Sequence, residues 1–102
     1  MFIDIGGKVM TIPPVNQTTL EGEDVRFKCV AKQPGARIVW YRDGVSLADI
    51  PDLWARSQVE KDGTLVILRT EHTDPGMFVC EVTNEAGEMQ TAGAYLNVLC
   101  TF

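Results

Sequence analysis

The sequence predicts an all-β sandwich in which two antiparallel sheets face one another. Short runs of β-branched and aromatic residues recur at intervals of about ten residues, with turn residues between them, as in sandwiches and barrels. No helical period extends over about ten residues, and the chain has no internal repeat. Cys29 and Cys80 lie at the centres of two such runs, where one disulfide could join the two sheets.

The first strand is predicted to be broken. Residues 9–12 and 15–20 flank Pro13-Pro14, and proline cannot donate a hydrogen bond to a strand ladder. We therefore expect an edge strand whose two halves can pair with different sheets. After a turn at 21–24, residues 25–31 alternate as a half-buried antiparallel strand does. Its inward residues are Val25, Phe27, Cys29 and Ala31.

The middle of the chain is predicted to hold two turns built on Asp-Gly pairs. Residues 37–41 form a strand, and Asp43-Gly44 tolerates the positive φ of a tight hairpin before a short return strand over 45–48. Residues 53–60 are less regular. The second turn, Asp62-Gly63, leads into a strand over 64–69. Two residues of that strand share its inward face: Leu65 and Ile67.

The last two strands are predicted at 77–83 and 89–99, with a turn at 84–87 between them. In both strands the period of two places alternate residues on one inward face. The inward residues are Phe78, Cys80 and Val82 in the first strand, and Ala94, Leu96 and Val98 in the second.

Length and charge restrict the function. The 102 residues suffice for one domain, which we place at 8–99, between an N-terminal linker or appended segment at 1–7 and a boundary segment at 100–102. Nine basic against fourteen acidic residues give a net charge of −5, which disfavours nucleic acid and anionic membranes as partners. No apolar run is long enough to cross a membrane, and the first residues lack the plan of a signal peptide.

The cysteines and a tryptophan form one constellation. Trp40 lies on the inward face of the strand between those of Cys29 and Cys80, so a bridge between facing sheets would have this indole packed beside it. The closed loop of about fifty residues would stabilise the fold by roughly 4 kcal/mol. Cys100 follows the last strand with no obvious mate. It is either a bridge to another chain or a free thiol at the boundary, and the second reading is favoured.

With these residues the chain resembles an immunoglobulin domain of the intermediate set, over nearly its whole length, with the Greek-key order of that fold. The spacing between Cys29 and Cys80 is too short for the two extra strands of antibody variable domains. The residues that carry the resemblance are Glu21, Gly22, Cys29, Trp40, Asp43, Gly44, Asp62, Gly63, Leu65, Ile67, Asp74, Gly76, Cys80, Asn84, Gly87, Leu96 and Val98.

The resemblance implies several structural roles. The Cys29–Cys80 disulfide would join the sheets, and Arg56 would pair with Asp74 across the bottom of the sandwich, although an isolated surface pair contributes little. The core would be built on Trp40, Phe78, Leu65 and Ile67.

A closer likeness lies in residues 13–23 and 61–92. These segments resemble immunoglobulin domains of the Turtle and Borderless group of neuronal adhesion proteins. The resemblance implies the extracellular part of a single-pass plasma-membrane protein, with several such domains in tandem, that takes part in contact recognition during neural wiring.

Two kinds of side-chain site can be considered. Asn16-Gln17-Thr18 is an N-glycosylation acceptor triplet on the predicted first edge strand, where a glycan would keep that edge from joining a partner sheet. A metal site is not expected, because the only histidine, His72, has no second ligand at metal spacing. No cofactor motif is present either.

One sheet face is the candidate contact surface. Strict alternation places residues of three strands on the outer side of a single sheet, where they form an aromatic and apolar surface with a polar border. Aromatic residues are enriched at the centres of protein interfaces. Scattered exposed apolar residues are also normal, which is an equally good explanation. The candidate residues are Val39, Tyr41, Val79, Glu81, Tyr95 and Asn97.

Three functions follow from these features. The first is an adhesion or receptor module that binds another immunoglobulin domain, of its own kind or not, through sheet-face or end-loop contacts. The second is a spacer that binds only its neighbours in a tandem array, and the third is an intracellular muscle-type scaffold domain. Oxidised cysteines and a glycan favour the cell surface, and reduced thiols favour the cytoplasm. An enzyme is not expected, because the sequence holds no catalytic triad, phosphate loop or catalytic metal ligands.

Phe78 departs from the pattern of the family, which usually has tyrosine two residues before the second cysteine. We expect Phe78→Tyr to leave the free energy of unfolding unchanged or to raise it by up to about 1 kcal/mol, the net contribution of one hydrogen bond. Thermal unfolding of the two proteins checks this. A clear fall in the melting temperature of the variant would contradict it.

Overall fold

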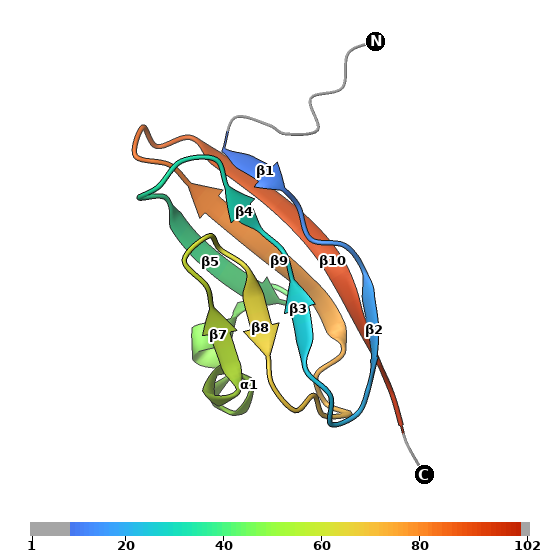
Figure 1. The fold of residues 1–102 in the computed structure, drawn as a ribbon. Helices are drawn as coiled ribbons and strands as arrows, with labels where there is room; N and C mark the ends of the chain where they lie inside the picture. The colour runs from blue at the N-terminus through green and yellow to red at the C-terminus, as the bar shows by residue number, and fades with distance from the viewer. Residues whose placement is uncertain (1–8, 101–102) are drawn as a thin grey trace.

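Two layers of strands pack face to face in the computed structural model, which describes residues 9–100 (Figure 1). One layer is a five-stranded sheet in the order β2-β10-β9-β5-β6. The other holds a three-stranded sheet, β3-β8-β7, and the two-stranded pair β1-β4. The predicted all-β sandwich with one disulfide between its sheets is confirmed. The linker expected at 1–7 lies outside the described residues.

The strands are β1 (Met10–Ile12), β2 (Gln17–Leu20), β3 (Val25–Phe27), β4 (Val30–Ala31), β5 (Arg37–Arg42), β6 (Val45–Ser46), β7 (Ser57–Val59), β8 (Leu65–Ile67), β9 (Gly76–Thr83) and β10 (Met89–Leu99). Between β6 and β7 the chain forms one turn of 3₁₀ helix, Leu47–Asp49, and the short helix α1, Pro51–Ala55.

The two prolines split the first strand between the layers, as expected. β1 pairs antiparallel with β4, and β2 pairs with β10, in the opposite layer. The β2–β10 pairing is parallel, which corrects the expectation that both sheets are purely antiparallel. Parallel neighbours need a long connection, and here nearly the whole domain lies between the two strands.

Two predicted strands and one irregular stretch differ from the observed structure. The strand over 25–31 is interrupted at residues 28–29: β3 pairs with β8 of the three-stranded sheet, whereas β4 pairs with β1. The return strand over 45–48 ends at Ser46. The irregular stretch at 53–60 includes the second half of α1 and all of β7. The helix begins at Pro51, whose fixed φ suits the first helical position.

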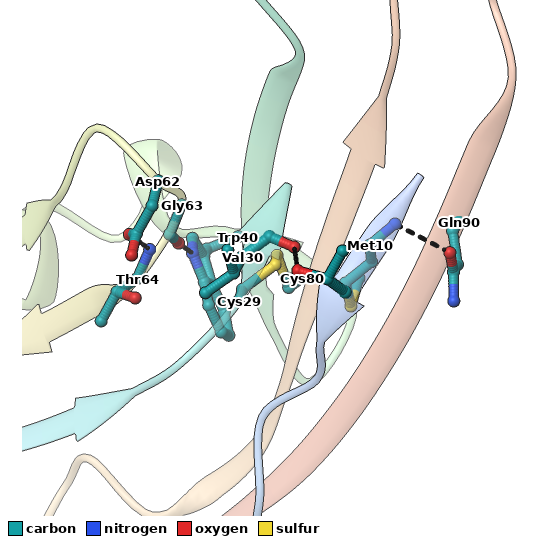
Figure 2. Close-up of a disulfide and its surroundings, with 10 residues drawn as sticks. Met10, Cys29, Val30, Trp40, Asp62, Gly63, Thr64, Cys80 and Gln90 are labelled. Carbon is teal, nitrogen blue, oxygen red and sulfur yellow. Dashed lines mark hydrogen bonds between the residues drawn. A yellow bond between two sulfur atoms is a disulfide. The ribbon is translucent and has the colours of Figure 1, made fainter. Parts of the chain in front are cut away.

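The core surrounds the Cys29–Cys80 disulfide (Figure 2). The two Cα atoms are 6.5 Å apart, and both cysteines are fully buried. The Phe27 ring stacks on Phe78 with centroids 5.3 Å apart and lies 6.2 Å from the Trp40 ring. The four residues expected in the core are all buried: Trp40, Phe78, Leu65 and Ile67.

Gly63 joins the second Asp-Gly turn to this core. Its carbonyl oxygen accepts a hydrogen bond from the Trp40 indole N–H, over 2.8 Å (Figure 2). Its φ is +112°, and a Cβ at this position would collide with the backbone carbonyl oxygen of Cys29. Beside it, the Asp62 carboxylate accepts the backbone N–H of Thr64, and this hydrogen bond holds the pKa of Asp62 below its usual value. The positive φ of Gly63 and its close approach to Cys29 both require glycine at this position.

Replacing this glycine should cost much more than replacing the glycine of the other Asp-Gly turn. Gly44 also has a positive φ, +84°, but a Cβ there would meet nothing within 4 Å. We expect Gly44→Ala to lower the free energy of unfolding by about 1 kcal/mol, the conformational term alone. Gly63→Ala should lower it by at least about 3 kcal/mol, because the collision with Cys29 is added. Chemical denaturation measures both. Equal losses would show that the close approach to Cys29 is unimportant.

Candidate protein-binding face

The outer face of the five-stranded sheet carries the residues predicted as a contact surface. Strand register places Val39 of β5 opposite Glu81 of β9, and Tyr41 opposite Val79. Each of these four side chains is partly buried. The outer face therefore has a compact group of predicted residues on its two central antiparallel strands.

The two predicted residues of β10 lie further along the sheet. Tyr95 is opposite Met77 of β9, whereas Asn97 extends past the end of β9 and lies beside Thr18 of β2. Thr91 of β10 is the residue in register with Glu81. Six residues of strand separate it from Asn97, which is roughly 20 Å. Asn97 is thus on the outer face but not within reach of the main group.

Gly93 connects the two parts of this face. It is in register with Val79, and a Cβ on it would lie 3.3 Å from the Met77 sulfur and 3.4 Å from a Val79 methyl carbon. The Met77 and Val79 side chains therefore lie over the bare backbone of β10. The result is an apolar strip that runs from Tyr41 across to Tyr95, which we call the Tyr41–Tyr95 strip.

The sequence-based reasoning missed Met77 and Gly93. Met77 is 43% exposed, nearly as much as Tyr95 at 46%, so it is a major part of the accessible apolar surface. The same alternation that selected Val79 and Glu81 also selects Met77 and could have found it. Gly93 has no side chain, and only strand register shows its role.

A hydrogen bond fixes the polar border of the strip. The Tyr41 hydroxyl donates to a Glu81 carboxylate oxygen over 3.3 Å. Desolvation raises the pKa of Tyr41, the negative charge of Glu81 raises it further, and Arg37 opposes both effects. The phenol therefore stays neutral at physiological pH and can donate or accept a hydrogen bond at an interface.

Among the described residues, one hollow lies away from this face and a second has Val39 in its lining. One of about 340 Å³ is lined by the loop at 31–36, Ile38 and the turn at Lys61 and Asp62. The other, of about 270 Å³, lies beside Trp40, Trp54 and Val59. Neither is lined by a nucleophile together with a base, so neither has the arrangement of a catalytic site.

The remaining predicted sites are at the surface. Asn16 is exposed, and its side-chain oxygen accepts the backbone N–H of Tyr95 over 2.8 Å. Cys100 is an exposed free cysteine. His72 lies 3.4 Å from a Glu21 carboxylate oxygen. Across residues 9–100 no three acidic, histidine or cysteine side chains gather as metal ligands, and the helices of this part of the chain are too short or too polar to span a membrane.

Arg56 and Asp74 form a buried ion pair, not the exposed one that was expected. The guanidinium donates two hydrogen bonds to the Asp74 carboxylate, over 2.8 and 2.9 Å, and further bonds to the Leu68 and Arg69 carbonyls. Arg56 is 8% exposed and Asp74 is 1% exposed. The hydrogen bond to Asp74 raises the pKa of Arg56, so its charge is permanent. The pair joins the end of α1 to the loop before β9.

Removing one charge of this pair should be strongly destabilising. Asp74→Asn removes the buried partner of the Arg56 charge and leaves beside it only the more exposed Glu71 carboxylate, 3.4 Å away, and that of Asp52. We therefore expect a loss of about 3 kcal/mol in the free energy of unfolding, the lower end of the cost of breaking a buried ion pair. Asp52→Asn is the matched control, because Asp52 lies 3.8 Å from Arg56 but is largely exposed. It should cost at most about 0.5 kcal/mol. Denaturant titration of both variants measures this, and similar losses would contradict a special role for the buried partner.

Comparisons with known proteins agree on one family. The sequence profile described as an immunoglobulin domain matches residues 9–84. Two fruit-fly (Drosophila melanogaster) proteins are each 46% identical: Protein turtle over 95 residues and Protein borderless over 94, each match covering 91% of this chain. The expected resemblance to this group is confirmed. The chain spans only 6% of the length of the first relative and 13% of the second.

Solved structures show the same fold. The immunoglobulin-like domain of human leucine-rich repeat-containing protein 4 superposes with a TM-score of 0.80 and 28% identity, covering all of this chain and 97% of the other. A crystal structure of a complex of titin with an obscurin-like immunoglobulin domain gives a TM-score of 0.75 and 28% identity, covering 91% of this chain and 94% of the other.

Proposed function

The chain belongs to the immunoglobulin domain family, and from this we propose that it is a non-catalytic protein-binding module in the ectodomain of a cell-surface adhesion or recognition receptor. The observation that carries the proposal is the 46% identity to Protein turtle and Protein borderless over most of the chain. The resemblance to that neuronal group favours a role in axon or dendrite patterning. It also favours a single-pass plasma-membrane protein with neighbouring immunoglobulin domains.

Three structural features support an extracellular binding role. The Cys29–Cys80 disulfide requires an oxidising compartment to persist. The Tyr41–Tyr95 strip offers aromatic and thioether side chains with a polar border, the composition of an interface centre. The net charge of −5 disfavours nucleic acid and anionic lipid as partners. The partner we propose is another immunoglobulin domain, either a second copy of this chain or a different surface protein.

A second candidate function has its own observation. The likeness to the titin complex, at 28% identity, favours an intracellular scaffold domain of the muscle type. Both cysteines would then be reduced in the cell. Counting free thiols in denatured protein taken directly from its source separates the two: one free thiol supports the surface receptor, and three support the scaffold. A spacer domain would also show one thiol, so binding must separate it from a receptor module.

Binding should depend on the outer face. The wild-type chain is displayed on beads and tested for bead aggregation with itself and for capture of purified immunoglobulin-superfamily ectodomains. We expect Tyr41→Ala to weaken the observed binding at least tenfold, or about 1.4 kcal/mol, because an aromatic side chain at an interface centre contributes most of the affinity. The matched control is Gln58→Ala, on the exposed face of the opposite sheet, which should bind as the wild type does.

Two outcomes would count against this proposal. Binding that survives Tyr41→Ala but is lost through changes in the end loops would place the contact at the ends of the domain and overturn the role of the outer face. Failure to bind any immunoglobulin domain, with the fold and disulfide intact, would also favour the spacer.

A further inference from the structure

The acceptor triplet Asn16-Gln17-Thr18 lies where the chain enters β2, at one end of the five-stranded sheet. β2 pairs only with β10, so its other edge has no strand beside it within the described chain. The side chains of Asn16 and Thr18 are both exposed. The triplet is therefore presented at an open sheet edge, which is the part of a β-sandwich most prone to pair with another chain.

The two polar atoms of the Asn16 amide have different roles. The side-chain oxygen accepts the backbone N–H of Tyr95 over 2.8 Å and so continues the β2–β10 ladder by one step. No hydrogen bond joins the amide nitrogen, Nδ2, to any of residues 9–100. N-glycosylation uses this nitrogen and leaves the oxygen unchanged, so the bond to Tyr95 can persist in the modified protein.

We propose that Asn16 carries an N-linked glycan whose base lies beside Tyr95 of β10, and that the bulk of this glycan hinders pairing at the neighbouring free edge of β2. The modification is a group transfer from an oligosaccharide linked to a lipid diphosphate. A bond forms between Nδ2 and the first carbon of the sugar, the bond from that carbon to the diphosphate oxygen breaks, and Nδ2 loses one proton as the lipid diphosphate leaves. No oxidation or reduction takes place. The inference rests on the proposed extracellular location, but not on the identity of the partner.

The position of the glycan restricts how a partner can approach. Asn16 is hydrogen-bonded to Tyr95, which is one end of the Tyr41–Tyr95 strip. β2 and β5 are separated by β10 and β9, a distance of roughly 14 Å at the usual strand spacing. The glycan therefore starts beside Tyr95 and well away from Tyr41. A partner on the outer face would approach from the β5 side, and edge-to-edge pairing through β2 would be blocked.

The test is the mass of the whole chain after secretion from eukaryotic cells behind a cleavable signal peptide. Wild type, Thr18→Ala, Thr18→Ser and Thr19→Ala are compared before and after treatment with peptide N-glycosidase. Changing Thr18 removes the acceptor triplet without touching Asn16 or its bond to Tyr95. We expect a glycan, removed by the enzyme, on wild type, Thr18→Ser and the neighbouring control Thr19→Ala. Thr18→Ala should have the mass of the bare chain.

A secreted wild-type protein with the bare mass would overturn the modification site. This result would leave the proposed function standing, because the bead assay reads binding and not glycosylation. Conversely, a glycosylated chain that binds no immunoglobulin domain would overturn the proposed function alone.

The role of the glycan at the edge is tested separately by sedimentation velocity. We expect the folded Thr18→Ala protein, with one free thiol like the wild type, to self-associate at a concentration at least tenfold lower than the wild type. Equal self-association of the two glycoforms would overturn the edge-covering role.

Discussion

The Cys29–Cys80 disulfide, with the side chains packed beside it, is the constraint on which the rest of the domain depends. Cys80 is in register with Trp40, so the disulfide and the indole occupy neighbouring positions on one side of the sheet. The indole N–H is in turn held by Gly63 of the opposite layer. Once these side chains point inward, the period of two directs Tyr41 and Val79 outward. The buried bridge thus sets which residues can meet a partner.

Local patterns predicted most of the fold. Alternation identified the long strands. Pro13-Pro14 indicated the break in the first strand, and the Asp-Gly pairs indicated the turns. Helix α1 escaped detection because five residues are too few to show a 3.6-residue period. The parallel pairing of β2 with β10 joins segments from opposite ends of the sequence, and no local signal encodes such a contact.

The sequence predicted which residues of the candidate site point outward, but not which of them lie close together. Alternation shows that Tyr95 and Asn97 point outward, yet only the register with β9 shows that Tyr95 joins the strip and Asn97 does not. The other difference between prediction and structure is the burial of the Arg56–Asp74 ion pair. The charges of Arg56 and Asp74 suggested a solvated pair, because the sequence cannot show that α1 and the loop before β9 close over them.

The parallel alignment of β2 and β10 has a mechanical consequence. β1 begins at one end of the long axis of the domain and β10 finishes at the other (Figure 1). A pull applied at the start of β1 and at the end of β10 acts along this axis, in opposite directions on β2 and β10. The hydrogen bonds over the register from Gln17–Leu96 to Leu20–Leu99 are then loaded together in shear and cannot open one after another. Under such a load the domain resists extension until this short ladder ruptures as a unit.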